Sequence, residues 1–157
     1  HLSRDDPVTG LLNGRAFRDV FEHDWAVAAR EKSSLAVVNF TLDDFDAYKY
    51  VFGRHSADSA LRRVGQAIRR CLRRASDVAA RSDGQHFLVL SHAADETNVR
   101  EFAARISAAV RELGLHHPRS TKGRFVTVSF EVAAAEPASD KRDATELLDE
   151  LLGATSD

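Results

Sequence analysis

Apolar side chains recur every three to four residues in four stretches of the chain, a pattern typical of amphipathic helices. The first predicted helix runs from the capping residue Asn13 to about Glu31. The second begins at Ser56 or Asp58, and the last begins at Asp143. The inward-facing positions are Phe17, Val20, Phe21 and Trp25, then Leu61, Val64, Ile68, Cys71 and Leu72, then Val99, Phe102, Ala103, Ile106 and Val110, and finally Leu147, Leu148 and Leu151.

Short apolar, β-branched runs between these helices predict strands. A short helix from Asp43 or Asp44 to Tyr50, ended by Gly53, follows the first strand. A tight turn centred on Asp83-Gly84 should join the second and third strands as a hairpin. The predicted strands are Leu35–Phe40, Asp77–Arg81, His86–Leu90 and Phe125–Val132. This order predicts an α/β fold, an α+β sandwich whose central mixed, mostly antiparallel sheet is flanked by helices.

Composition narrows the class of protein further. The chain has 157 residues, 43% of them hydrophobic and 29% charged, which suits one folded domain and argues against disorder. The single cysteine, Cys71, excludes a disulfide framework and a zinc site built on several thiolates. No apolar run reaches the roughly 20 residues that a membrane span needs. No signal peptide is evident either, so we expect a cytoplasmic domain.

Charge is close to balanced overall but uneven along the chain. The formal net charge of -2 argues against a general nucleic-acid binder. Seven arginines nevertheless fall within twenty residues, where they form either a solvated helix face or an anion site. They are Arg62, Arg63, Arg69, Arg70, Arg73, Arg74 and Arg81.

Several segments in the correct order resemble the GGDEF domain of bacterial diguanylate cyclases. The opening residues 6–17 resemble its D-x-L-T-G-L-x-N-R-R-x-F motif, and Val126–Ser129 resembles its late T-V-S-I-G-V strand. Arg74, Asp77 and Arg81 match R-x-x-D-x-x-x-R ahead of the signature hairpin at residues 82–86. The resemblance implies the nucleotidyl-cyclase-like fold. In active members it implies condensation of two GTP molecules into cyclic di-GMP by a two-fold dimer.

The signature itself is degenerate in this chain. The family's five signature positions correspond to Asp83, Gly84, Gln85, His86 and Phe87, of which the second Gly and the Phe match. The resemblance also implies a metal-binding Asp at the end of the first strand, where this chain has Thr41. Magnesium prefers carboxylate oxygens, so we expect no catalytic residue, no metal site and no magnesium cofactor. Asp43 lies two residues further on and is a displaced candidate ligand.

The nucleotide site implied by the resemblance is altered as well. Lys49 stands where the family reads guanine with an Asn, and a lysine has donors only. Asp58 matches the second guanine-binding position, although it could equally serve at a helix N-terminus. We therefore treat Thr41, Asp43, Lys49 and Asp58 as a vestigial nucleotide site.

The pair Arg74 and Asp77 has the spacing of the family's inhibitory, product-binding site. Arginine can hold a phosphate and stack on guanine, and aspartate can accept hydrogen bonds from guanine N1 and N2. Arg105 on the next helix could add a second guanidinium. Two interpretations remain for the pair, a cyclic di-GMP site or a surface ion pair of little energetic value.

These observations predict that residues 1–157 form a single degenerate GGDEF domain from a larger protein. We expect a catalytically inactive regulatory, dimerising or scaffold module in cyclic di-GMP signalling. PAS and EAL domains are the expected neighbours, and tandem GGDEF–EAL receptors of the FimX kind, which govern type IV pili, are an analogy only. The alternatives are a GTP-sensing allosteric domain and a weak residual diguanylate cyclase. The pair His116-His117 is expected to lie in an exposed loop.

Overall fold

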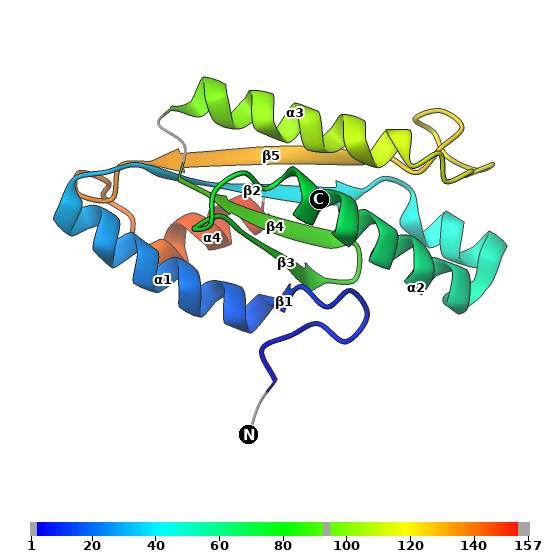
Figure 1. The fold of residues 1–157 in the computed structure, drawn as a ribbon, viewed down its shortest axis with the longest axis horizontal. Coiled ribbons are helices and arrows are strands. Elements are labelled where there is room, and N and C mark those ends of the chain that lie inside the picture. Colours follow the sequence, from blue (N-terminus) through cyan, green and yellow to red (C-terminus); the bar gives the residue numbers. More distant parts are fainter. Residues whose placement is uncertain (1–2, 93–94, 154–157) are drawn as a thin grey trace.

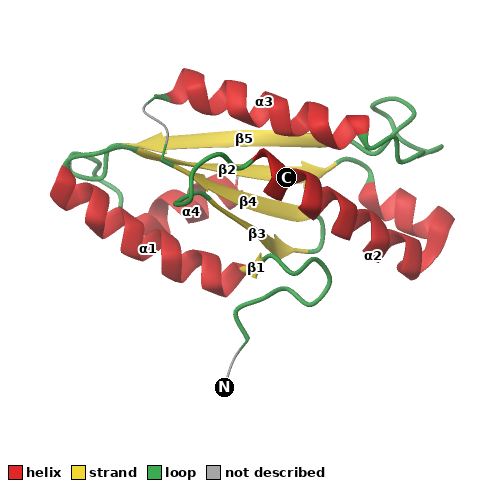
Figure 2. Cartoon of the chain, in the orientation of Figure 1, coloured by secondary structure: helices red, strands yellow, loops and turns green. Residues whose placement is uncertain are grey.

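The computed structural model describes residues 3–92 and 95–153, and within them a single five-stranded sheet carries helices on both faces (Figures 1 and 2). The sheet has the strand order β1-β3-β4-β2-β5, in which β1 pairs with β3 in parallel and the other neighbours are antiparallel. The mixed, mostly antiparallel α/β architecture predicted from the sequence is therefore confirmed. The elements are β1 (Leu12–Asn13), α1 (Gly14–Glu31), β2 (Leu35–Leu42), α2 (Phe45–Cys71), β3 (Val78–Asp83), β4 (His86–Ser91), α3 (Glu96–Glu112), β5 (Val128–Ala135) and α4 (Ala144–Gly153).

Each face of the sheet has its own apolar core, because successive side chains of a strand point to opposite faces. Val38 and Phe40 of β2 face a cluster that α2 and α3 complete, whereas Leu35 and Val37 face a cluster that α1 and α4 complete. α3 lies along β5 on the first of these faces (Figure 1). The fold is thus a three-layer arrangement, with β2 and β4 buried in the middle of the sheet.

Capping interactions place the helix starts where the sequence predicts them. The Asn13 side chain accepts a hydrogen bond of 2.8 Å from the backbone N–H of Ala16 at the start of α1. Asp143 and Glu146 form a reciprocal capping box, in which each side chain accepts from the other's backbone N–H. Both features tie a helix end to a specific residue, so these boundaries are readable from sequence.

The two predicted helices between residues 43 and 72 form one kinked element, α2. Gly53 lies inside it with φ of 84° and ψ of 174°, a conformation that breaks the helical hydrogen-bond pattern and favours glycine. The first part begins after Asp44, which has a left-handed φ of 54°. The prediction of two helices separated at Gly53 is therefore confirmed in substance.

Two strands differ from their prediction. β5 spans Val128–Ala135, so the predicted range Phe125–Val132 is three residues too early. Residues 125–127 pair elsewhere: Val126 donates its N–H to Leu115, and the Thr127 carbonyl accepts from Asp43. The short parallel strand β1 was not predicted, because two residues carry no periodicity.

The predicted hairpin forms, with its turn one residue later than expected. Asp83 pairs with His86, which leaves Gly84 and Gln85 as the turn residues. An irregularity between Arg81 and Asp83 shifts the register of β3 against β4. The prediction of a turn centred on Asp83-Gly84 was wrong for this reason, since an inserted residue in one strand moves the turn along the chain.

Candidate functional site

The end of β2 and the start of β4 meet at the signature hairpin, where Thr41 and His86 are paired residues of the sheet. Thr41 Oγ1 lies 3.0 Å from His86 Nδ1, so the two side chains form a hydrogen bond. The Gln85 amide lies against the carbonyl of Leu42, at 3.5 Å. The family resemblance implies carboxylates at these three positions. The chain instead has a neutral hydroxyl, an amide and an imidazole there, and these groups contact one another or the backbone.

The two aspartates after β2 accept hydrogen bonds from the loop before β5 and from the start of that strand. The Asp43 carboxylate accepts hydrogen bonds from the Thr127 hydroxyl at 2.7 Å and the Ser129 hydroxyl at 2.6 Å. The Asp44 carboxylate accepts from the backbone N–H and the hydroxyl of Thr121, at 2.8 and 2.7 Å. These hydrogen bonds, the backbone one first, hold the pKa of Asp44 below its ordinary value.

The remaining members of the vestigial nucleotide site lie on α2. The Lys49 ammonium sits 5.5 Å from the centre of the Phe45 ring. Asp58 lines a separate open pocket of about 340 Å³ with Arg54 and His55, beyond the kink at Gly53. Among the interactions between described residues, Thr41 is the one member of these four whose side chain contacts the signature hairpin.

A pocket of about 480 Å³ borders the hairpin on the face of α1 and α4. Its polar lining combines two arginines of the first turns of α1 with side chains of the hairpin. No acidic pair faces it, because Asp83 is the lone carboxylate of the lining. The lining residues are Gly14, Arg15, Arg18, Ser82, Asp83, His86, Leu88 and Leu152.

Arg74, Asp77 and Arg105 line a second pocket, of about 250 Å³, at the other end of β3 and β4. Arg74 and Asp77 precede β3, whereas Arg105 lies in α3, after β3 and β4. The structure therefore brings residues from distant parts of the sequence into one pocket. Arg74 and Arg105 are exposed, whereas Asp77 is buried, with 4% of its side chain exposed. The other lining residues are Arg73, Ser91, Asn98, Glu101 and Phe102.

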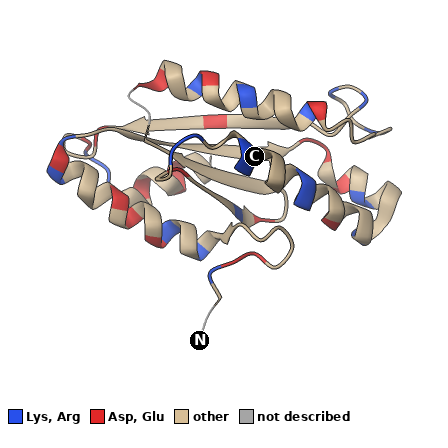
Figure 3. Ribbon diagram, in the orientation of Figure 1, with Lys and Arg blue, Asp and Glu red and all other residues tan. Residues whose placement is uncertain are grey.

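The charge pattern of this second pocket suits an anion with a polar planar ring. Arg73, Arg74 and Arg105 supply three guanidinium groups, and the last is 5.8 Å from the centre of the Phe102 ring. Basic residues continue along the second half of α2 and the loop after it (Figure 3). Guanidinium groups can bind phosphate with two parallel hydrogen bonds, and the buried Asp77 carboxylate can accept from ring N–H groups.

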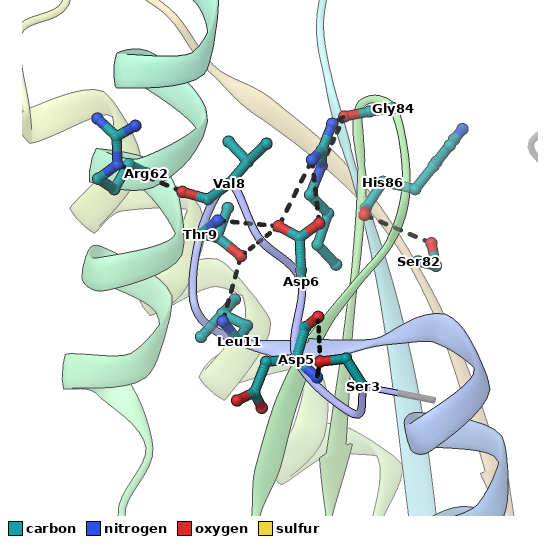
Figure 4. Close-up of polar contacts among 11 residues, drawn as sticks. Ser3, Asp5, Asp6, Val8, Thr9, Leu11, Arg62, Ser82, Gly84 and His86 are labelled. Atoms are coloured by element: carbon teal, nitrogen blue, oxygen red, sulfur yellow. Dashed lines mark hydrogen bonds and ion pairs between the residues drawn. The ribbon is translucent and has the colours of Figure 1, made fainter. Parts of the chain in front are cut away.

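A network around Asp6 fixes the signature hairpin to the segment before β1. Arg81 donates to the Asp6 carboxylate at 3.2 Å and to the Gly84 carbonyl at 2.9 and 3.0 Å. The same carboxylate accepts from the backbone N–H and the hydroxyl of Thr9 (Figure 4). Arg81 matches the family motif in the sequence, but its partner could not be predicted, because Asp6 lies 75 positions away.

Two further polar residues were not anticipated. His92, just after β4, contacts the carboxylates of both Asp24 and Asp77. His117 was expected in an exposed loop together with His116, but it is 1% exposed and its Nε2 donates to the Asp44 carbonyl at 2.9 Å. That prediction was wrong for His117, because the loop before β5 folds back over α2 and places its ring against Tyr48.

Residues 3–92 and 95–153 contain no cluster of three or more His, Cys, Asp or Glu side chains arranged to hold a metal ion. None of their helices has both the length and the apolar character needed to cross a bilayer.

Comparisons with known proteins agree with one another. The family model described as "Diguanylate cyclase, GGDEF domain" matches residues 3–154. The cyclic di-GMP phosphodiesterase PdeR of Escherichia coli is 35% identical over 114 residues, which cover 70% of this chain and 16% of PdeR. The chain therefore spans less than a fifth of the length of that relative.

Solved structures match over almost the whole chain. The GGDEF domain of DgcB from Caulobacter crescentus, solved in complex with c-di-GMP, has a TM-score of 0.84 at 22% identity and covers 98% of this chain and 88% of its own. The FimX GGDEF domain from Pseudomonas aeruginosa has a TM-score of 0.79 at 18% identity, over 97% and 91% of the two chains. At these identities the likeness establishes the fold.

Proposed function

The chain belongs to the GGDEF domain family of diguanylate cyclases, and from that premise we propose that it is a catalytically inactive member that binds cyclic di-GMP. Its binding site is the pocket of Arg74, Asp77 and Arg105, and its role is that of a regulatory module in the cytoplasm. The observation that carries the proposal is that Arg74 and Asp77, identified by motif spacing, line one pocket together with Arg105, the candidate second guanidinium on the next helix.

The contacts at the signature hairpin support inactivity. Joining two nucleotides requires metal ions that neutralise phosphate charge, and magnesium is held by carboxylate oxygens. Thr41 and His86 hydrogen-bond to each other at the positions in question. Asp43, the displaced candidate ligand, already accepts short, charge-assisted hydrogen bonds from Thr127 and Ser129, which hold its carboxylate toward β5. A metal ion bound by this aspartate would have to share the carboxylate with those two hydroxyls.

The chemistry of the second pocket supports cyclic di-GMP as its ligand. The ligand carries two phosphodiester charges and two guanine rings, each with N–H donors on one edge. Arg74 and Arg105 match the phosphates and ring faces, and Asp77 matches the N–H edge. A surface ion pair between Arg74 and Asp77 is the competing interpretation, but the Arg74 guanidinium instead donates to the carbonyl of His92.

The regulatory role extends the proposal to partners outside the chain. The relative PdeR is called a cyclic di-GMP phosphodiesterase, and the match covers only a small part of it. We therefore propose that neighbouring PAS and EAL domains, or a second copy of the chain, receive the signal. A link to type IV pili remains an analogy with the FimX kind of receptor.

Calorimetric titration of the 157-residue chain with cyclic di-GMP tests the proposal. We expect binding by the wild type and a loss of roughly tenfold or more in affinity in Arg74→Ala and in Arg105→Ala, the effect of removing one charge-assisted pair. Arg100→Ala is the matched control, since this exposed arginine of α3 pairs with Glu96 and does not line the pocket. Equal binding by all four proteins would place the ligand elsewhere.

A parallel incubation with GTP and magnesium separates the alternatives. Formation of cyclic di-GMP would contradict inactivity and identify a residual cyclase. GTP binding without turnover, lost in Asp58→Asn, would identify a GTP sensor. Silence with both nucleotides, in a folded sample, would leave a scaffold that acts through protein contacts alone.

A further inference from the structure

His92 lies between the proposed ligand pocket and helix α1. It follows Ser91, the last residue of β4 and part of the pocket lining. Its Nε2 is 3.1 Å from Asp24 Oδ2 on α1, and its Nδ1 is 3.5 Å from Asp77 Oδ1. One imidazole ring therefore touches a pocket carboxylate on one side and the opposite layer of the fold on the other.

The backbone of His92 contacts two residues of the pocket, Asp77 and Arg74. Its N–H donates to Asp77 Oδ1 at 3.2 Å, and its carbonyl accepts from the Arg74 guanidinium. In the described part of the chain, every hydrogen bond of the Asp77 carboxylate falls on Oδ1. This arrangement turns Oδ2 into the oxygen that can accept from a bound ring N–H.

We propose that His92 is a positioning residue of the cyclic di-GMP pocket, which orients the Asp77 carboxylate and couples occupancy of the pocket to helix α1 through Asp24. The inference rests on the proposed function, because it assigns a role to His92 at that same site. The coupling has a direct physical path: the ring cannot move toward Asp77 without lengthening its contact with Asp24.

The protonation state of an imidazole sets the strength of this arrangement. A neutral ring has one N–H and can donate to one of the two carboxylates, whereas an imidazolium donates to both. The groups that face the ring are Asp24 from α1 and Asp77 from the loop before β3, with Arg74 at the carbonyl of His92. Across the pocket stand Arg73, Glu101 and Arg105.

Protonation of the ring should therefore strengthen ligand binding. A protonated ring donates to Asp77 and Asp24 at once and places a positive charge beside a dianionic ligand. For one added charge at a partly exposed site, we expect affinity to be about three- to tenfold higher with the ring protonated than with it neutral. Phosphodiesters and guanine do not titrate between pH 6 and pH 8, so a pH dependence in this range belongs to the protein.

The test is calorimetry with cyclic di-GMP at pH 6 and pH 8 on the full 157-residue chain. The variants are His92→Gln, which keeps a polar side chain that does not titrate, and Asp24→Asn, which alters only the far side of the ring. His23→Gln is the matched control, because His23 is an exposed neighbour of Asp24 on the same helix. Thermal unfolding checks that each variant is folded, and Asp24→Asn serves if His92→Gln is not.

We expect the wild type to bind cyclic di-GMP more tightly at pH 6 than at pH 8, and His23→Gln to behave in the same way. His92→Gln should bind more weakly, with an affinity that does not change between the two pH values. In Asp24→Asn the change in affinity with pH should be smaller than in the wild type. A wild-type profile in both His92→Gln and Asp24→Asn, with binding still lost in Arg74→Ala, would overturn the positioning role and leave the proposed function standing. A folded wild type that binds no cyclic di-GMP at either pH would overturn both, and this pattern is distinct from the previous one.

Discussion

The Asp6 carboxylate is the point at which the segment before β1 and the signature hairpin are joined, and we predict that its removal destabilises the whole domain. Asp6 accepts from Thr9 through two hydrogen bonds of 2.8 and 2.9 Å and from Arg81 at 3.2 Å. Only 12% of the Asp6 side chain and 14% of the Arg81 side chain are exposed. In Asp6→Ala, the Arg81 guanidinium keeps the Gly84 carbonyl but loses its counter-ion (Figure 4).

The magnitude follows from the contacts that disappear. Hydrogen bonds to charged groups contribute about 1.5–3 kcal/mol each when buried, and orphaning one partner of a buried ion pair costs about 3–5 kcal/mol. Because both side chains keep some solvent contact, we take a value near the lower end, about 3 kcal/mol for Asp6→Ala. For a domain of this size that corresponds to a fall in Tm of roughly 6–12 °C. Asp6→Asn keeps an acceptor for Thr9 and should lose about half as much.

Urea unfolding followed by circular dichroism measures these differences, with Asp5→Asn as the matched control because the neighbouring Asp5 is exposed. A double-mutant cycle with Arg81→Met then isolates the ion pair, and we expect a coupling energy of about 1–2 kcal/mol. A loss below about 1 kcal/mol in Asp6→Ala would refute the reasoning, since it would mean that solvent replaces the network at little cost.

Three further predictions concern separate parts of the fold. Hydrogen bonds from Thr121 lower the pKa of Asp44, so the stability that this group contributes is complete above its unfolded pKa and is lost as the pH drops through the lower folded pKa. Asp44→Asn should therefore be less stable than the wild type at pH 7, and its stability should decline less steeply below about pH 4. Urea unfolding at several pH values measures both differences. In Gly14→Ala the new Cβ would meet the Ser82 carbonyl oxygen at 3.0 Å, which should cost about 1–3 kcal/mol in thermal unfolding, and an unchanged Tm would show that the hairpin can retreat from α1. Asn13→Ala removes the N-cap of α1 and should cost about 1 kcal/mol, whereas Asn13→Asp should restore the wild-type value.

Local chemistry explains why much of the fold could be predicted from the sequence. Helix starts at Asn13 and Asp143 are set by side chains that cap the helix they precede, so the signal lies within four residues. The break at Gly53 follows from a backbone conformation that favours glycine. The start of β5 could not be found in this way, because Phe125–Thr127 pair with a loop and with Asp43 rather than with β2. Alanines at the end of β5 also carry weak strand propensity.

The residues of the candidate site could likewise be predicted where the signal is local in sequence, and could not where their partners are distant. Arg74 and Asp77 were identified because their spacing is a local motif, and the structure shows that Arg105 joins them in one pocket. His92 carried no such signal, since its partners are on α1 and before β3 and an isolated histidine at a strand end has no characteristic neighbours. The partners of Asp43 and Asp44 were likewise hidden, because they come from the loop more than 70 positions later.

The arrangement of β3 and β4 separates the signature hairpin from the pocket of the proposed function. The hairpin is held by backbone pairing and by Arg81, which binds the carbonyl of Gly84 and the carboxylate of Asp6. None of these contacts uses the side chain of Gln85 or His86, so they do not depend on which side chains stand at those two signature positions. The pocket of Arg74 and Asp77 lies at the opposite end of the same strands and shares no lining residue with the pocket beside the hairpin. Substitutions at the signature end therefore need not disturb an anion site at the other end, which is the separation that an inactive, ligand-binding domain requires.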